Sequence, residues 1–330
     1  MKYFYSKYLA ISIMIVSGFC FSTGTVHAFS VSRSTIEHVI EPGKLISGSF
    51  SVKNETDTIA NFDVVLRGFQ PIGETGEMDF FSSNETLPEL SWFSTQENFL
   101  ILQPHEVRDF QYTISVPTDA SAGGHYVAIL FSRAAPQELT TTPTIMTGSK
   151  NGVSFFIRVT GAIQEGVGVL DFSSMPSDSF RRLPVSFETR LQNLGNVHVK
   201  PSGSVVIKNF LGREVTKLPF NPDSILILPN GTRRFLSTWA KTDMTEQRKG
   251  AGWVSSVMVE LRNFAFGPYT AEIQAVYGDS EQRLSAKTSF WIVPWSVISV
   301  ASALLVLLIL ATRFYNRFLV GRHIRKLNSR

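Results

Sequence analysis

The sequence predicts an all-β protein built from two tandem sandwich domains, followed by one transmembrane helix. Three observations support this. Short runs alternate apolar and polar residues and are separated by Gly, Pro, Asn and Asp, which is typical of antiparallel strands. A set of short motifs occurs twice in the same order. An uncharged apolar stretch, residues 292–312, lies near the C-terminus and is followed by a basic tail.

Residues 1–28 are predicted to be a signal peptide. Lys2 and Lys7 precede an apolar run, and Val26-His27-Ala28 has the small-x-small pattern of a cleavage site, with cleavage after Ala28. The single cysteine, Cys20, lies in this segment, and the large Phe19 before it does not fit a lipoprotein signal. The mature chain therefore has no cysteine and needs no disulfide, which fits a bacterial extracytoplasmic protein better than an animal one.

Residues 291–312 are predicted to form the transmembrane helix. A helix over the uncharged stretch would measure about 31 Å, the thickness of a bilayer core. Trp291 and Trp295 stand where interfacial aromatic residues belong. The tail, residues 313–330, contains six Lys and Arg and no acidic residue, so the positive-inside rule places it in the cytoplasm. We therefore expect a single-pass protein of the cell membrane with its N-terminal ectodomain outside the cytoplasm.

The charge balance excludes one class of partner. Residues 29–291 contain 23 Lys and Arg against 27 Asp and Glu. The body is therefore mildly acidic, and the basic character of the whole chain comes from its two ends. A mildly acidic body offers no electrostatic basis for nucleic-acid binding, whereas the basic tail suits anionic lipid headgroups.

Four short motifs repeat along the ectodomain, each with a polar turn or an alternating strand. They predict a first domain over residues 29–165 and a second over 166–290. Each proline turn is followed by a phenylalanine, Phe110 or Phe235, that should point into a core. The matched segments are 51–57 with 191–196, 102–110 with 228–235, 124–128 with 267–271, and 153–159 with 284–290.

The third match, Gly-x-Tyr-x-Ala, contains the residues that we expect to have a structural role. Gly124 and Gly267 should permit a bend in the chain. Tyr126 and Tyr269 should each start a late strand, with the alanine two positions later on the same face. This arrangement is typical of the tyrosine corner of immunoglobulin-like sandwiches, in which the hydroxyl bonds back to the main chain. The sequence therefore predicts immunoglobulin-like domains.

His198 is the polar residue whose role is least obvious. By the repeat it lies on a strand that corresponds to residues 60–66 of the first domain, where no histidine occurs. Val197 and Val199 should face the opposite side. We therefore expect a structural role for His198.

No pattern of catalytic or metal-binding residues is present in the ectodomain. Its histidines form neither HxH nor HExxH, zinc thiolate ligands are missing, no G-x-S-x-G occurs, and the aspartates lack the spacing of a calcium loop. We predict a non-enzymatic protein with no catalytic residue, metal or cofactor. The histidines are His38, His105, His125 and His198.

Two segments could provide a binding surface. Residues 134–152 form a long Thr-rich loop that carries either recognition or no more than a flexible spacer. Residues 73–93 combine turn residues with four aromatic side chains, part of which must be core. The aromatic residues are Phe80, Phe81, Trp92 and Phe93.

The first domain resembles the bacterial WxL-interacting proteins of Gram-positive cell surfaces. The resemblance covers roughly residues 36–160 and is carried by segments 41–54 and 102–131. Its most specific part is the pattern formed by Pro117, Asp119, Ala120, Gly123 and Gly124. The order of signal peptide, two domains, membrane span and basic tail is also similar. The resemblance implies peptidoglycan binding by the first domain and contact with WxL proteins or host ligands by the second.

Together these observations predict a membrane-anchored cell-surface binding protein. Its partner would be a cell-wall polymer such as peptidoglycan, a surface protein, or both. The alternative is a membrane-tethered, chaperone-like assembly factor that lends a strand edge to exported surface proteins. The sequence does not identify the ligand-binding residues.

Overall fold

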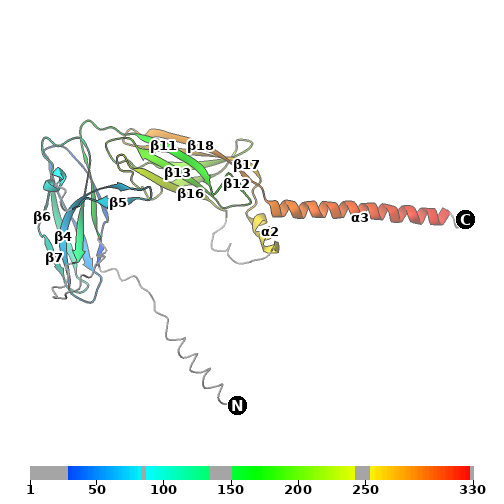
Figure 1. Ribbon diagram of the computed structural model, residues 1–330, viewed down its shortest axis with the longest axis horizontal. Helices are drawn as coiled ribbons and strands as arrows, with labels where there is room; N and C mark the ends of the chain where they lie inside the picture. The colour runs from blue at the N-terminus through cyan, green and yellow to red at the C-terminus, as the bar shows by residue number, and fades with distance from the viewer. Residues whose placement is uncertain (1–28, 83–86, 134–150, 242–252, 328–330) are drawn as a thin grey trace, which may run out of the picture.

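The computed structural model describes residues 29–82, 87–133, 151–241 and 253–327. The predicted signal peptide with Ala28, and residues 134–150 of the Thr-rich loop, lie outside this part of the chain. The described residues form eighteen strands, one 3-10 helix and two α-helices. The predicted all-β class is confirmed, together with one apolar helix at the C-terminal end. The strands form two pairs of sheets, which we call the first and second sheet pair, and α3 projects from the far end of the second pair (Figure 1).

The first sheet pair contains β1 to β10. Its smaller sheet has the order β1-β3-β8-β6, and its larger sheet has the order β2-β10-β9-β4-β5, with β7 also paired to β4. All pairings are antiparallel except that of β2 with β10. The 3-10 helix Pro88–Trp92 connects β5 and β6. The strands are β1 Phe29–Val31, β2 Thr35–Ile40, β3 Leu45–Asn54, β4 Ala60–Ile72, β5 Glu77–Phe80, β6 Phe93–Thr95, β7 Phe99–Leu102, β8 Val107–Ser115, β9 Gly123–Arg133 and β10 Asn151–Val159.

The second sheet pair contains β11 to β18. A three-stranded sheet, β11-β13-β16, faces a five-stranded sheet, β12-β18-β17-β14-β15. The strands are β11 Val167–Met175, β12 Ser179–Phe180, β13 Val185–Asn193, β14 Ser202–Asn209, β15 Glu214–Phe220, β16 Thr232–Trp239, β17 Gly267–Tyr277 and β18 Gln282–Ile292.

Each sheet pair encloses its own buried apolar cluster, and the alternation in sequence explains why. In β10 every second residue from Val153 to Val159 points into the first core. In β18 the same period places Leu284 and Phe290 in the second core. Phe110 and Phe235 are both buried, as the proline turns before them predict. The two proline turns also match in backbone form, since His105 and Asn230 both adopt φ of 57°.

A buried asparagine closes the same turn in both sheet pairs. Asn54 and Asn193 end β3 and β13, and both are fully buried. Each side-chain NH2 donates to main-chain carbonyls of two further segments, and each side-chain oxygen accepts from the N–H two residues later, at 3.0 Å and 2.8 Å. Among the carbonyl acceptors are Thr58 and Gln103 for Asn54, at 2.8 and 3.0 Å, and Val197 and Ile227 for Asn193, at 2.7 and 2.8 Å. The first sequence match therefore reflects shared hydrogen-bond chemistry.

The Gly-x-Tyr-x-Ala match, in contrast, does not describe equivalent positions. In β17, Tyr269 and Ala271 face the core of the second sheet pair. In β9, Tyr126 and Ala128 face the opposite way, out of the first core. Tyrosine and alanine share a face in each strand, as predicted, but the two strands differ by one residue in register. A one-residue slip exchanges the two faces of a strand.

The tyrosine corner predicted for Tyr126 is not formed within its own sheet pair. Its hydroxyl lies 3.3 Å from Nδ1 of His198, which belongs to the second sheet pair. No hydrogen bond to the hydroxyl of Tyr269 is present among the described residues, and its ring stacks on Phe290. Gly267 has φ of 101°, as a bend requires. Gly124 is needed for another reason, because a Cβ there would overlap the hydroxyl of Tyr126.

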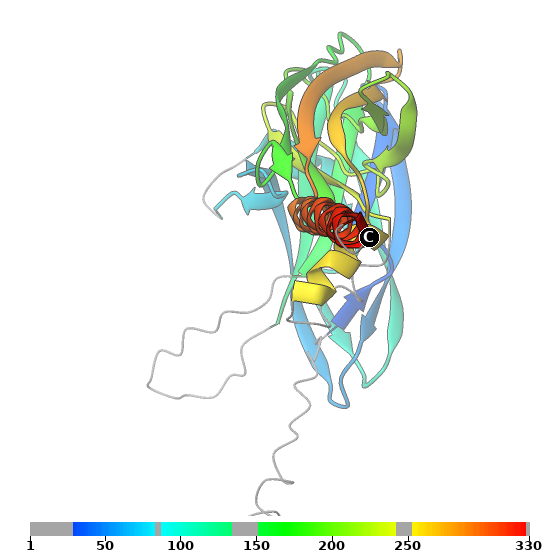
Figure 2. The ribbon, with the colours of Figure 1, turned by 90° about the vertical axis from the view of Figure 1, so that its right-hand side faces the viewer.

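Two α-helices stand at the far end of the second sheet pair. The helix α2, Trp253–Arg262, was not predicted; it precedes β17. The helix α3, Trp295–Leu327, begins after Pro294, so Trp291 belongs to β18. Its segment Trp295–Arg317 contains an 18-residue stretch with a mean hydropathy of 2.3 and is long and apolar enough to cross a membrane. Figure 2 shows α2 beside the start of α3.

Candidate functional site

The two sheet pairs meet along the outer face of the larger sheet of the first pair. Tyr126 and its neighbours on that face pack against the segment that follows β15, so this sheet is covered on both sides. A third apolar cluster, which we call the junction cluster, fills the contact. Its buried members are Phe69, Ala128, Leu130, Phe156 and Leu228, with Met78, Phe80, Tyr126 and Leu226 packed around them.

The β4–β5 hairpin holds the second sheet pair from one side. Gly76, at its tip, has φ of 92°, and the guanidinium of Arg233 occupies the space that a Cβ would need. Glu74, in the same turn, accepts from Nε of Arg190 at 2.9 Å. The N–H of Arg234 donates to the Glu74 carbonyl, also at 2.9 Å. The hairpin is therefore fixed by both main-chain and side-chain contacts.

His198 lies at the centre of the junction. Its side chain is 9% exposed and is enclosed by the rings of Tyr126 and Phe156, at centroid distances of 5.8 and 5.6 Å. Burial lowers the pKa of the imidazole to about 4, and the nearby Arg158 and Lys200 act in the same direction against Glu37. His198 is therefore neutral at pH 7.

The groups around His198 indicate which of its ring nitrogens can accept a hydrogen bond. The carboxylate of Glu37 lies 3.9 Å from Nε2, which is too far for a hydrogen bond, and an ion pair would need a charged imidazole. In the tautomer that carries its proton at Nε2, toward Glu37, Nδ1 accepts from the hydroxyl of Tyr126. Burial raises the pKa of that hydroxyl, so it stays protonated and able to donate.

The structural role predicted for His198 agrees with this position, but the predicted strand is reduced to one bridge. Val199 pairs with Ile227, as Ala60 pairs with Leu102 in the first sheet pair, so the predicted correspondence holds. Pro201 then interrupts the chain before β14, whereas β4 continues without a break. Val199 faces the second core, away from His198.

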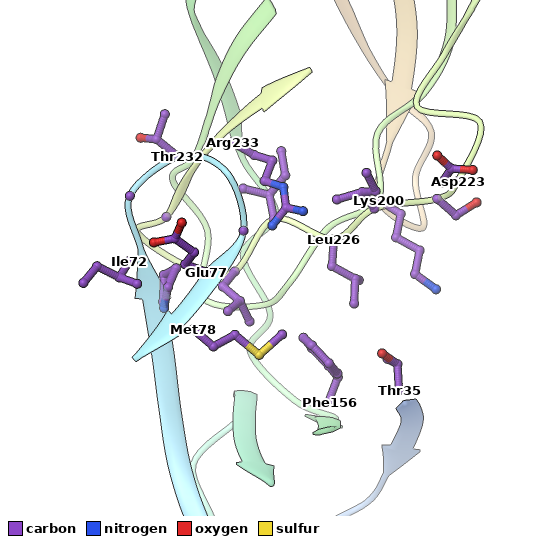
Figure 3. Close-up of a pocket in the computed structure, with 18 of the residues that line it drawn as sticks. Thr35, Ile72, Glu77, Met78, Phe156, Lys200, Asp223, Leu226, Thr232 and Arg233 are labelled. Atoms are coloured by element: carbon purple, nitrogen blue, oxygen red, sulfur yellow. The ribbon is translucent and has the colours of Figure 1, made fainter. Parts of the chain in front are cut away.

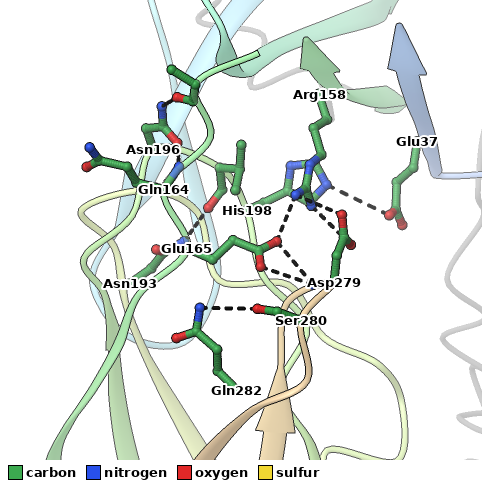
Figure 4. Close-up of polar contacts among 12 residues, drawn as sticks. Glu37, Arg158, Gln164, Glu165, Asn193, Asn196, His198, Asp279, Ser280 and Gln282 are labelled. Carbon is green, nitrogen blue, oxygen red and sulfur yellow. Dashed lines mark hydrogen bonds and ion pairs between the residues drawn. The ribbon is translucent and has the colours of Figure 1, made fainter. Parts of the chain in front are cut away.

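Charged groups surround the buried histidine. Arg158 contacts Glu165 at 2.8 Å and Asp279 at 3.0 Å, and the side chain of Glu165 is only 8% exposed (Figure 4). Lys200 contacts Glu37 at 2.6 Å, which joins the second sheet pair to β2. Because these pairs link separate segments at the junction, they oppose reorientation of one sheet pair against the other.

A main-chain clasp completes the junction. The N–H of Gly124 donates to the carbonyl of Asn196 at 2.8 Å. The side-chain oxygen of Asn196 accepts from the N–H of Gln164, also at 2.8 Å. Gln164 belongs to the short connection between β10 and β11. Asn196 therefore bonds both to β9 and to this connection.

Beside the junction cluster lies a cleft of about 440 Å³ (Figure 3). Strand β2, the β4–β5 hairpin and residues 223–233 form its walls. Its surface combines apolar side chains with charged ones, among them Met78, Phe156, Leu226, Lys200, Asp223 and Arg233. Burial lowers the pKa of Arg233, and no carboxylate of the described residues pairs with its guanidinium. The cleft therefore offers an apolar floor and one unpaired cation.

Strand β2 forms one side of the cleft and has an edge that no strand of the described residues pairs with. Within the described part of the chain it pairs only with β10, in parallel register. Ile36 and Ile40 point into the first core, while Thr35 and Glu37 line the cleft. The carbonyls of Ser34 and Ile40 accept from β10, so main-chain groups of the odd-numbered residues face the free edge. An unpaired edge of this kind can accept a further strand.

The other residues singled out in the sequence lie apart. Trp92 and Phe93 belong to the first core, whereas Phe80 packs at the junction and Phe81 lies over Gly68. No group of three side chains able to hold a metal ion occurs within the described ranges. The remaining histidines each have a separate contact: His38 with Tyr112, His105 with Asp57, and His125 with Glu89.

His125 is a second buried histidine, and it lies at the first core. Burial disfavours its charged form, but hydrogen bonds to Glu89, at 2.8 Å, and to the carbonyl of Ser121, at 2.9 Å, outweigh this. The pKa of His125 is therefore raised, and the pKa of Glu89 is lowered by the same contact. Its ring also packs on Trp92 at a centroid distance of 4.6 Å.

Comparison with known proteins gives only remote likeness. No family model matches the sequence, and no curated protein matches it. Among solved structures, the class 5 fimbriae chaperone CfaA is 11% identical with a TM-score of 0.37, covering 79% of this chain and 98% of its own. The SafB chaperone in complex with the SafA pilin of Salmonella enterica is 7% identical with a TM-score of 0.34, covering 82% and 99%. Scores of this size carry no functional inference.

Proposed function

We propose that this chain is a non-catalytic, membrane-anchored binding protein that holds an extended segment of another envelope protein. The two sheet pairs act as immunoglobulin-like modules, and α3 is the single membrane span. The basic tail lies in the cytoplasm, and the modules lie outside it. The observation that carries the proposal is the free edge of β2 along the junction cleft.

The edge and the cleft would contribute to recognition in two ways, through main-chain hydrogen bonds and through side-chain contacts. A partner strand added to β2 would gain main-chain hydrogen bonds, which give affinity without regard to sequence. Every second side chain of that strand would enter the cleft, where Met78 and Phe156 favour apolar groups and Arg233 favours a carboxylate. The preferred partner is therefore an exported protein with an exposed apolar strand and an acidic residue. This is the role of an assembly factor, and it is also compatible with a WxL-type surface protein as partner.

The buried polar groups support a binding role over a catalytic one. His198, Tyr126 and Glu165 are all used in contacts between the sheet pairs. Because Lys200 and Glu37, which both line the cleft, form an ion pair across the junction, the cleft has fixed walls. Pre-organised walls lower the cost of ordering a bound segment.

The test replaces one main-chain donor on the free edge. The N–H of Val39 faces away from β10, and its side chain is 68% exposed, so Val39→Pro removes an edge donor without breaking the β2–β10 ladder. A photo-crosslinker at Thr35 in the full chain, in its own membrane, should trap a partner protein. We expect Val39→Pro to reduce the trapped product at least tenfold and Val39→Ala to leave it unchanged.

The same variants distinguish binding to a partner protein from binding to the cell-wall polymer. Purified peptidoglycan sacculi are incubated with detergent-solubilised wild type, Val39→Pro and Val39→Ala. Retention on sacculi together with the absence of a crosslinked protein would replace the proposed partner by the cell-wall polymer. Equal crosslinking in both variants would show that strand addition at β2 is not the mode of binding.

A further inference from the structure

The end of the second sheet pair that carries α3 has several exposed apolar side chains. Phe210 and Leu211 form the tip of the β14–β15 hairpin and are 68% and 64% exposed. Because Asn209 pairs with Tyr269, this tip lies beside the start of β17. A Cβ at Gly267 would lie 4.0 Å from the Phe210 ring, which confirms that the two segments are neighbours.

The segment between α2 and β17 extends this surface. Phe264 and Phe266 are 46% and 57% exposed, and Leu261, in the last turn of α2, is half exposed. The helix α2 lies beside the first turn of α3 in both overall views (Figures 1 and 2). Trp295, the first residue of α3, is also exposed. We call these residues the basal face: Phe210, Leu211, Leu261, Phe264, Phe266 and Trp295.

A buried carboxylate fixes α2 to the start of α3. Glu260 is 2% exposed. Its Oε2 accepts from the N–H groups of Ser296 and Val297, at 3.0 and 3.2 Å, and its Oε1 accepts from the hydroxyl of Ser296 at 2.9 Å. The carboxylate thus satisfies free N–H groups of the first turn and complements the helix dipole. Wherever the N-terminal end of α3 lies, α2 must lie beside it.

Cations border the apolar surface. Nζ of Lys241 donates to the carbonyl of Phe264 at 2.6 Å, and Arg262 is exposed at the end of α2. Aromatic side chains together with adjacent Lys and Arg are the composition that favours the membrane interface. A contiguous apolar surface of this kind is rarely left open to water in a soluble domain.

We propose that the basal face docks into the headgroup–acyl boundary of the bilayer, on the ectodomain side. The occupant is the lipid surface because Glu260 ties this face to the first turn of α3, so the bilayer that holds α3 must reach it. This inference rests on the proposed membrane anchoring. Docking at several points around α3 orients the second sheet pair relative to the membrane, which one helix alone would not do.

The test measures depth at single cysteines in the full chain, with Cys20→Ser as background. An NBD fluorophore is placed at Leu211→Cys, Phe266→Cys and, within α3, Leu308→Cys. The matched control is Leu194→Cys, because Leu194 is 65% exposed but follows Asn193 at the junction end of the same sheet pair. The protein is reconstituted in phosphatidylcholine–phosphatidylglycerol nanodiscs that contain doxyl-labelled lipid. We expect at least threefold stronger quenching at Leu211 and Phe266 than at Leu194.

The label at Leu308 distinguishes failure of the docking from failure of the membrane anchor. Strong quenching at Leu308 with control-level quenching at Leu211 and Phe266 would overturn the docking while the membrane anchor stands. Control-level quenching at all three positions would overturn the anchor itself. In a further variant that carries Phe210→Ser and Leu211→Ser, quenching at Phe266 should fall toward the control value, since the face then loses part of its apolar area.

Discussion

The two sheet pairs share their turns but differ in which strand faces they bury. Asn54 and Asn193 close equivalent turns with the same hydrogen bonds, whereas Tyr126 faces the junction and Tyr269 faces a core. The larger sheet of the first pair is covered on both sides, so β9 is buried continuously from Val127 to Phe131. Turn chemistry is thus set locally by the backbone, while the burial of a strand face depends on what packs against it.

The largest expected effect concerns the shared feature. Asn54→Ala and Asn193→Ala each leave buried main-chain carbonyls without a donor, which should lower the free energy of unfolding by about 3–5 kcal/mol. Urea denaturation of residues 29–291 measures this, and Asn61→Ala, at an exposed position of β4, serves as control. A loss in only one of the two variants would show that the turns are not equivalent in energy.

The next effect is pH dependence at the junction. The pKa of His198 is about 4 in the folded protein and about 6.5 in an unfolded chain. Between these values the unfolded state binds the extra proton, so stability should fall by about 2–3 kcal/mol as the pH drops from 6.5 to 4. His198→Gln should remove this part of the pH dependence, whereas His105→Gln, at a side chain that is 60% exposed, should not.

His125 contributes with the opposite sign. Its pKa is raised, so the stability that it provides is present below pH 6.5 and is lost as the pH rises through its folded value. The contribution of His198 is therefore obtained from the difference in free energy of unfolding between wild type and His198→Gln at each pH. An identical pH profile for both proteins would mean that the junction histidine is not buried in solution.

The smallest effect separates the two tyrosines. Tyr126→Phe leaves the buried Nδ1 of His198 without a donor and should cost about 1–2 kcal/mol. Tyr269→Phe should cost less than about 0.5 kcal/mol, because its hydroxyl has no partner among the described residues and its ring remains packed on Phe290. Equal losses in the two variants would restore the symmetric interpretation of the motif.

These contrasts show what the sequence could predict. The strands, the buried Phe110 and Phe235, and the apolar C-terminal helix follow from local patterns, and the structure confirms them. The junction does not, because its contacts join residues far apart in sequence, such as Gly76 with Arg233 and Glu37 with Lys200. A period-two pattern also states that a strand has two faces without stating which of them is covered.

The junction had one signal in the sequence that could have revealed it. His198 is polar but stands between two valines, three residues before Pro201, and Ile59 occupies the corresponding position in the first sheet pair. Ile59 is 55% exposed, whereas His198 is 9% exposed. At this position of the repeat, only the copy that carries the polar residue is buried against the other sheet pair. The helix α2 was missed because its ten residues are too few to give a clear helical period.

The way in which β18 meets α3 determines how the protein would transmit mechanical force. Only two residues separate the end of β18 at Ile292 from the start of α3 at Trp295. A partner held at the junction and drawn away from the cell would therefore load β18 along its own axis. Its eleven paired positions with β17 would then share the load in shear, instead of opening one after another. On the proposed function, the last strand would be the tether between a captured partner and the membrane.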